Sequence, residues 1–233
     1  TCLIWVSSCC FFLDEYKWGG CLADDMGLGK TLQVLTFLRH QIRENKKATN
    51  LVVAPTTLIF NWENEIKKFC PDIKYMIHWG VDRNRNTEEF GKHQLILTSY
   101  GTMTNDIEFI RGFEFNYVVL DESQAIKNPG AKRYKAACLL QSRNRLTMTG
   151  TPVENNTFDL YAQMNFLNRG MLGSVNFFKS EFSNPIDKNG DEDKIEALKK
   201  LVYPFILRRT KEQVAKELPP KTEDIIFCEM GIK

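Results

Sequence analysis

Short apolar runs alternate with longer segments of helical period along the first two thirds of the chain. Two of these segments, Thr31–Arg43 and Thr57–Phe69, carry apolar residues every three or four positions, which predicts helices. Strands that alternate with helices indicate right-handed βαβ units around a parallel sheet covered on both faces. The expected fold is therefore α/β with a mostly parallel sheet. The predicted strands are Gly20–Ala23, Leu51–Ala54, Lys74–His78, Leu95–Ser99, Tyr117–Leu120 and Leu146–Thr149.

The pattern changes after Pro152 and becomes helical. Helices are predicted over Phe158–Leu167, Val175–Phe182 and Lys194–Val202, and Asn184–Asp193, with its Pro and Gly, is predicted to be a loop. A stretch over Phe205–Glu217 leads to a Pro-Pro pair and then to strand character at Thr222–Met230. We therefore expect three parts: a lobe over 1–156, a helical insertion over 157–203, and a linker into a further domain over 204–233.

Composition is that of an ordinary globular protein. The 233 residues are 43% hydrophobic and 26% charged, which excludes a disordered or collagen-like chain. With 31 basic against 29 acidic residues the net charge is +2, so the chain is no histone-like polycation, although a local basic face remains possible. The seven cysteines are odd in number and include no CxxC spacing, which is typical of reduced intracellular thiols and indicates no zinc site.

The first residues are almost uncharged. Thr1–Leu13 has the apolarity of a signal-peptide core, but it has no basic start and no small-residue cleavage site. It is also too short to span a bilayer, so a buried first helix is favoured and no membrane partner is expected. Because the chain opens on Thr, we expect it to be a fragment of a longer protein.

A phosphate-binding loop follows the first predicted strand. The strict pattern G-x-x-x-x-G-K-[ST] has Gly where this chain has Asp24, but G-x-G-K-T is intact. Gly27 and Gly29 allow backbone N–H groups to converge on phosphate oxygens at a helix start, Lys30 supplies a positive charge, and the Thr31 hydroxyl can bind Mg²⁺. The predicted phosphate-binding residues are Asp24, Asp25, Met26, Gly27, Leu28, Gly29, Lys30 and Thr31.

Acidic residues follow the apolar strand Tyr117–Leu120. Asp121, at the carboxyl end of this strand, is predicted to hold Mg²⁺, and Glu122 to orient and deprotonate the attacking water. An Asp-Glu pair that merely opens a helix is the alternative. The predicted catalytic residues in these two segments are Lys30, Asp121 and Glu122, with Thr31 and Asp121 as metal ligands.

A third element, Leu146–Pro152, is a strand that ends in Gly and small hydroxyl residues, at the place where open α/β sheets bind ligands. Thr149 and Thr151 are candidates to sense the γ-phosphate or to touch the acidic segment. A strand followed by a Thr-Pro turn is the structural alternative.

Taken in order, the strings GLGKT, VVAPTTL, LILTSY, DESQ and LTMTGTP resemble the amino-terminal RecA-like lobe of a helicase superfamily-two motor. DDMGLGKT, NWENEIKKF and FILRRTK narrow the resemblance to Swi/Snf-type DNA-dependent ATPases, over roughly residues 11–230. It implies a RecA-like P-loop lobe with a helical protrusion inserted after the third motif.

The resemblance implies that Asp24–Thr31 are the ATP-binding residues and that Asp121–Gln124 handle Mg²⁺ and water, which adds Gln124 to the catalytic residues. It also implies translocation on double-stranded DNA, with remodelling of protein–DNA complexes. It assigns DNA contact to Pro55, Thr56, Thr57, Thr98, Ser99 and Tyr100, and coupling of the two sites to Thr149, Gly150 and Thr151. Such hydroxyls and helix starts bind phosphates whatever the base. Other implied partners are a second RecA-like lobe of the same polypeptide and, among targets, nucleosomes or RNA polymerase. The location is intracellular, in the cytoplasm or nucleoid of a bacterium or the nucleus of a eukaryote.

Two departures from the family pattern matter. Residues 1–10 contain no Gln that would recognise adenine, and the second lobe with its arginine fingers is missing. Since an arginine finger raises the rate about a thousandfold or more, the fragment is expected to be nearly inactive. A nucleic-acid or polymerase interaction module with a vestigial motor, and an RNA helicase, are the alternatives.

Several basic groups leave two interpretations open, a phosphate-tracking face or solvated helix surface. Trp62 is expected to pack in the core rather than to stack on bases. Lys127 and Asn128 are expected in a solvated loop, and a mechanical role is expected for Arg208 and Arg209. The basic groups are Lys132, Arg133, Lys135, Arg143, Arg145, Lys199, Lys200, Arg208, Arg209 and Lys211.

Overall fold

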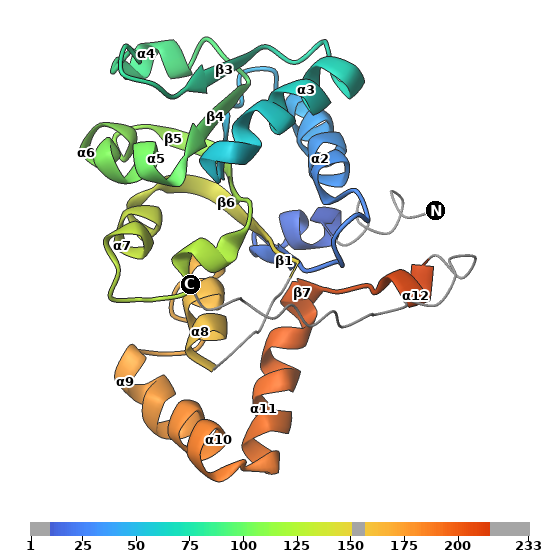
Figure 1. Cartoon of the computed structure of the whole chain (residues 1–233), viewed down its shortest axis with the longest axis vertical. Coiled ribbons are helices and arrows are strands. Elements are labelled where there is room, and N and C mark those ends of the chain that lie inside the picture. The colour runs from blue at the N-terminus through green and yellow to red at the C-terminus, as the bar shows by residue number, and fades with distance from the viewer. Residues whose placement is uncertain (1–9, 151–156, 215–233) are drawn as a thin grey trace, which may run out of the picture.

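The computed structural model describes residues 10–150 and 157–214. These residues form a seven-stranded sheet in the order β3-β4-β2-β5-β6-β1-β7, and every pairing between neighbours is parallel (Figure 1). The predicted α/β class is thus confirmed. The strands are β1 (Gly20–Leu22), β2 (Asn50–Ala54), β3 (Tyr75–His78), β4 (Leu95–Ser99), β5 (Glu114–Leu120), β6 (Gln141–Met148) and β7 (Ile206–Leu207).

The strand predictions are confirmed, with shifts at the ends. β4 has the predicted bounds. β6 begins at Gln141, five residues before the predicted start at Leu146, and the prediction missed its first half because those residues are polar and partly exposed. β7 was not predicted. It has only two residues, and no period can be recognised in so short a run.

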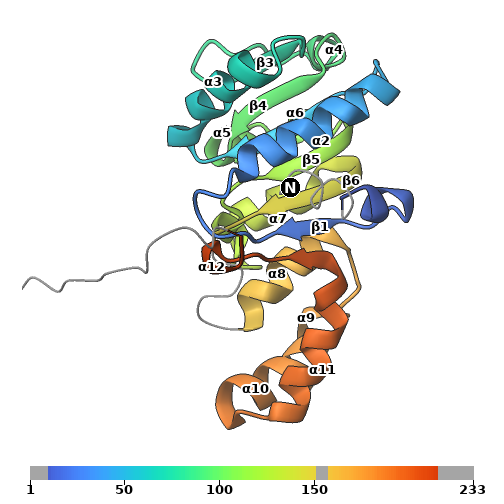
Figure 2. The same ribbon diagram turned by 90° about the vertical axis from the view of Figure 1, so that its right-hand side faces the viewer.

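Helices cover both faces of the sheet. Successive strand residues point to opposite faces, so Val52 and Val119 pack with α2 and α3, while Val53 and Val118 belong to the core on the other face. Figure 2 shows α2 crossing in front of the sheet with α6 and α7 behind it. The helices and 3₁₀ turns of the lobe are α2 (Lys30–Glu44), η1 (Thr56–Leu58), α3 (Ile59–Phe69), α4 (Thr87–Phe90), α5 (Tyr100–Asn105), α6 (Ile107–Ile110), η2 (Ser123–Ile126), α7 (Lys132–Leu139) and α8 (Thr157–Leu167).

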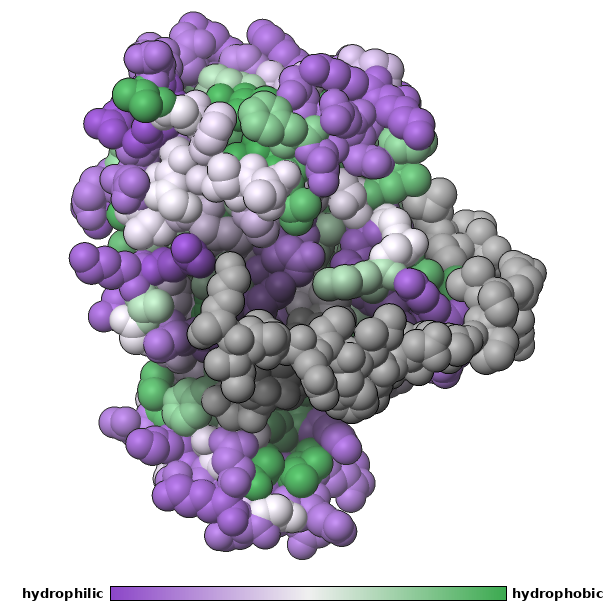
Figure 3. Space-filling view, in the orientation of Figure 1, coloured by the Kyte–Doolittle hydropathy of each residue, from purple (hydrophilic) through white to green (hydrophobic). Residues whose placement is uncertain are grey.

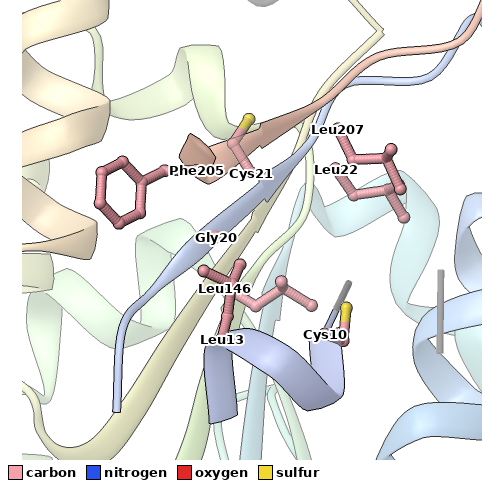
Figure 4. Close-up of a pocket in the computed structure, with 8 residues that line it drawn as sticks. All are labelled: Cys10, Leu13, Gly20, Cys21, Leu22, Leu146, Phe205 and Leu207. Carbon is pink, nitrogen blue, oxygen red and sulfur yellow. The ribbon is translucent and has the colours of Figure 1, made fainter. Parts of the chain in front are cut away.

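A short helix over residues 10–15 packs against β1, so the expected buried first helix is confirmed for its described part. Cys10 and Leu13 are buried and point toward β1 and β6 around a small apolar cavity (Figure 4). A Cβ atom at Gly20 would lie 2.5 Å from Leu13 Cδ1, so a side chain at this position would require the tip of Leu13 to move. None of the helices among the described residues has the length and apolarity needed to cross a membrane.

The residues after α8 form a helical protrusion that extends away from the sheet (Figure 1). One arm is continuous: α9 (Val175–Phe178), a π-helical turn (Lys179–Ser183) and α10 (Asn184–Asn189). The other arm is α11 (Glu192–Val202), which the 3₁₀ turn η4 (Tyr203–Phe205) joins to β7. The predicted strand at Thr222–Met230 lies outside the described residues.

The predicted loop at Asn184–Asp193 is wrong, since most of it is helix α10. Pro185 is the second residue of α10, which directly follows the π-helical turn, so the proline lies where the hydrogen-bond pattern of the continuous arm changes. Gly190 ends the helix in the left-handed conformation, with φ 65°. Gly190 is thus a helix end and Pro185 accompanies a change of helix type within the arm, so neither marks a loop.

A buried ion cluster holds the end of β3 to the loop between α5 and α6. Asp106 accepts hydrogen bonds from Arg83 Nε at 2.5 Å and from His78 Nε2 at 3.0 Å. The Arg83 hydrogen bond holds the pKa of the Asp106 carboxyl below its ordinary value, helped by His78 and opposed by burial. The Asp106 side chain is 1% exposed, so the ionised carboxylate depends on these partners.

We expect Asp106→Asn to lower the free energy of unfolding by about 3 kcal/mol at neutral pH, because Arg83 then loses its buried counter-charge. Since the pKa of Asp106 is lowered in the folded state, this contribution is lost as the pH falls through the lowered value. Urea titrations at several pH values measure it. Glu108→Gln, at an exposed pair with Arg111, is the control and should change stability little; an equal loss in both variants would contradict the prediction.

Candidate nucleotide site

Three chemical segments meet at the carboxyl edge of the sheet because their strands are neighbours. β1 pairs with β6, and β6 pairs with β5, with Leu22 opposite Met148 and Leu120 opposite Thr147. The phosphate loop follows β1, Thr149 and Gly150 follow β6, and the acidic segment follows β5. The predicted convergence of loop and carboxylates at one edge of a single sheet is thus confirmed.

The phosphate loop has the backbone that its glycines predict. Gly27 has φ 85° and Gly29 has φ 71°, both in the left-handed region that residues with a Cβ avoid. α2 begins at Lys30, directly after Gly29, so the N–H groups of its first turn point to the loop. This arrangement suits an anion with several oxygens.

The Lys30 side chain lies between the phosphate loop and Gly150, the second residue after β6. Its ammonium donates to the carbonyl oxygens of Asp24 at 2.6 Å and Asp25 at 3.2 Å. A Cβ atom at Gly150 would lie 3.9 Å from Lys30 Nζ and 3.0 Å from Met26 Cγ. A side chain at position 150 would therefore crowd Met26 at the tip of the loop, while its contact with the lysine would be an ordinary one.

Asp121 is almost completely buried at the end of β5, with 6% of its surface exposed. Its Oδ2 accepts from Trp62 Nε1 at 2.8 Å, and its Oδ1 accepts from the Glu122 amide at 2.9 Å. Burial raises the pKa of the Asp121 carboxyl; the Trp62 hydrogen bond and Lys30 oppose the rise, and the charge of Glu122 adds to it. The positive charge of Lys30 thus partly offsets the effect of burial on this carboxyl group.

A chain of hydrogen bonds joins the acidic segment to β6. Gln124 Nε2 donates to Glu122 Oε2 at 2.8 Å, and Thr149 Oγ1 donates to Gln124 Oε1 at 3.2 Å. The expected contact of Thr149 with the acidic segment is therefore present, whereas Thr151 lies outside the described residues. Glu122 has φ 49° and ψ 57°, a left-handed backbone that is rare for a residue with a side chain.

The residues predicted to contact DNA divide into two groups. Thr56 and Thr57 are exposed at η1, and Pro55 is partly exposed. Thr98, Ser99 and Tyr100 are instead buried. Their hydroxyls donate within the protein, to the His78 carbonyl, to Thr102 Oγ1 and to the Asp121 carbonyl. These three side chains therefore do not offer a surface to DNA, because Thr98 and Ser99 end β4, Tyr100 begins α5, and all three are covered.

Two contacts of the site were not foreseen from the sequence. Trp62 is in the core as expected, at 1% exposure, but its indole N–H is also a partner of Asp121. Asp24 is fully buried and pairs with Arg209, which lies after β7. The sequence pointed to Arg209 through the string FILRRTK, but that string did not predict that Asp24 is its partner.

The basic positions are also not uniform. Arg145 is partly buried and donates to the carbonyls of Phe166 and Leu140, so it joins β6 to α8 rather than forming part of a phosphate-tracking face. Lys127 and Asn128 are exposed in the loop before α7, as expected.

The donor set at this edge fits Mg²⁺. The Thr31 hydroxyl and the Asp121 carboxylate are hard oxygen donors, the type that this ion prefers. Each carboxylate oxygen of Asp121 accepts one hydrogen bond from the protein and keeps a lone pair for a cation.

A parallel sheet with a glycine loop and lysine after one strand, and carboxylates after a near neighbour, defines a RecA-like P-loop lobe for nucleoside triphosphates. The family model of the SNF2-related domain matches residues 6–232. A solved SWI2/SNF2 ATPase core of Sulfolobus solfataricus in complex with dsDNA is 41% identical, with a TM-score of 0.83, over 91% of this chain and 44% of that chain.

Curated relatives give the same result. Helicase ssl-1 of Caenorhabditis elegans is 38% identical over 94% of this chain and 10% of its own length. The chromatin-remodeling ATPase INO80 of Arabidopsis thaliana is 35% identical over 98% of this chain and 16% of its own length. The chain therefore belongs to the SNF2-related domain family, and it spans only a small part of these relatives.

We expect Trp62→Phe to weaken Mg²⁺-dependent ATP turnover about fivefold and to move the acidic limb of the pH profile upward. The ring still fills the core, but the loss of its N–H removes an interaction that opposes the rise of the Asp121 pKa. Phosphate release by the full-length protein across pH measures this. Tyr75→Phe is the control, because it removes a hydroxyl hydrogen bond from β3 to Glu63, which lies beside Trp62 on α3. An unchanged profile for Trp62→Phe would show that the indole N–H does not tune Asp121.

Proposed function

We propose that this chain is the ATP-binding lobe of a motor that couples ATP hydrolysis to movement along double-stranded DNA and remodels protein–DNA complexes. The observation that carries the proposal is the convergence of Lys30, Asp121 and Glu122 at one edge of the sheet, through the adjacency of β1, β6 and β5. The solved relative bound to dsDNA supports duplex DNA as the track.

In this proposal each side chain has one task. The loop amides and Lys30 bind the phosphates of ATP, and Thr31 and Asp121 hold Mg²⁺, which supplies positive charge to the phosphate oxygens when bound. Glu122 takes the proton of the attacking water. Its orientation is set by Gln124, which Thr149 in turn contacts from β6.

The DNA side of the proposal rests on the surface over η1 and α5. Side chains of intermediate hydropathy gather there, while hydrophilic ones surround them (Figure 3). The exposed hydroxyls of Thr56 and Thr57 lie at the start of this surface and can bind phosphates without reading bases. Thr149 and Gly150 then link the DNA and ATP sides through the acidic segment.

The remaining parts come from the resemblance to the family. A second RecA-like lobe of the same polypeptide would supply arginine fingers, so this lobe alone would hydrolyse ATP very slowly. Nucleosomes or RNA polymerase on DNA are the candidate obstacles, and the location would be intracellular.

We expect Lys30→Ala and Glu122→Gln each to lower DNA-stimulated ATP turnover of the full-length protein at least a hundredfold. The first removes a phosphate contact, and the second removes the group that accepts the water proton. Phosphate release is followed with duplex DNA, single-stranded RNA and no nucleic acid. Unchanged turnover in either variant would remove that role. Stimulation by RNA alone would favour an RNA helicase, and DNA binding without turnover in the parent would favour an interaction module.

We expect Thr56→Ala combined with Thr57→Ala to raise the duplex concentration for half-maximal stimulation severalfold, while turnover without DNA stays the same. Two hydroxyl donors to phosphate are lost, but no group of the ATP site changes. Thr36→Ala, on the exposed side of α2, is the matched control. Equal DNA dependence in the double variant and this control would exclude η1 from the DNA surface.

A further inference from the structure

Asp24 is a fully buried carboxylate at the start of the phosphate loop, in the position where the strict loop pattern has glycine. A buried carboxylate is costly unless it is paired and hydrogen-bonded. Arg209 meets this need: its backbone N–H donates to Asp24 Oδ1 at 3.0 Å, its Nε donates to the same atom at 3.1 Å, and its Nη2 pairs with Oδ2.

The same guanidinium reaches the far side of the loop through α2. Arg209 Nη2 donates to Gln33 Oε1 at 2.8 Å, and Gln33 Nε2 donates to the Leu28 carbonyl at 2.6 Å. Arg209 is therefore connected both to the first residue of the loop and to the turn between Gly27 and Gly29.

Residues 207–211, which we name the clamp segment, also run along the loop through the backbone. The Ala23 amide donates to the Leu207 carbonyl at 2.7 Å, and the Asp25 amide donates to the Arg209 carbonyl at 3.0 Å. The Lys211 amide then donates to Asp25 Oδ2 at 3.0 Å. The parallel pairing of β1 with β7 thus continues into the first half of the phosphate loop.

We propose that Arg209 is a positioning residue of the nucleotide site. It fixes the phosphate loop through Asp24 and Gln33, so that the loop amides and Lys30 are held in place before phosphates bind. The clamp segment comes directly from α11 by way of η4 and β7, so the protrusion and the phosphate loop are joined by a short, hydrogen-bonded path. This inference rests on the proposed function where it is tested by nucleotide binding. Its test by hydrogen exchange of the loop does not depend on that function.

The test uses Arg209→Lys in the full-length protein, because lysine keeps the charge beside Asp24 but cannot form the fork that also reaches Gln33. Arg208→Lys is the matched control, since Arg208 is exposed and lines a groove beside α11 instead of the loop. Asp106→Asn serves as a second control for general loss of stability.

The first measurement is binding of a fluorescent ATP analogue with Mg²⁺. We expect Arg209→Lys to raise the Kd about tenfold, and Arg208→Lys and Asp106→Asn to stay within twofold of the parent. In an Asp24→Asn background, Arg209→Lys should add no more than twofold, because both changes break the same contact.

The second measurement is hydrogen exchange of residues 24–33 without nucleotide. It should be several times faster in Arg209→Lys than in either control. Exchange and binding equal to Arg208→Lys, or losses matched by Asp106→Asn, would overturn the proposal. If the parent itself binds no nucleotide, the proposed function fails, while the exchange experiment still decides whether Arg209 holds the loop.

Discussion

The adjacency of β1, β6 and β5 is the constraint on which the whole site depends. None of the three segments that follow these strands forms a site alone, and they lie far apart in the sequence. Parallel pairing in register brings their carboxyl ends to one edge, where the charge of Lys30 acts on Asp121 and Thr149 hydrogen-bonds to Gln124. Helices on both faces keep the sheet buried, so the edge is held with little freedom.

The buried carboxylates of this edge are stabilised in different ways. Asp24 has a full counter-charge in Arg209 and is surrounded by donors. Asp121 has one indole donor and one amide donor, and its pKa is raised by burial. The first is a complete pair that fixes the backbone, whereas the second keeps capacity to accept a cation. The edge thus holds one carboxylate that is paired within the protein and a neighbouring one that has lone pairs left for a cation.

Much of the fold and of the nucleotide site could be predicted because their signals are local. Apolar runs gave the strands, and G-x-G-K-T and the acidic pair are short strings placed directly after strands. Other features depend on tertiary packing, which no local pattern encodes. The hydrogen bonds of Tyr100 and of Trp62 to Asp121 and the pairing of Asp24 with Arg209 each join residues far apart in the chain. The error at α10 was local, since Pro185 and Gly190 suit a loop as well as the two ends of a helix.

The backbone conformation of Glu122 lowers the stability of the lobe. A left-handed backbone costs a side-chain-bearing residue roughly 1 kcal/mol relative to glycine. Glycine at this position would relax the turn after β5 but would leave no carboxylate beside Asp121. The lobe is thus less stable here than its own backbone would permit, and a search for more thermostable versions of this lobe that ignored turnover would favour loss of this residue.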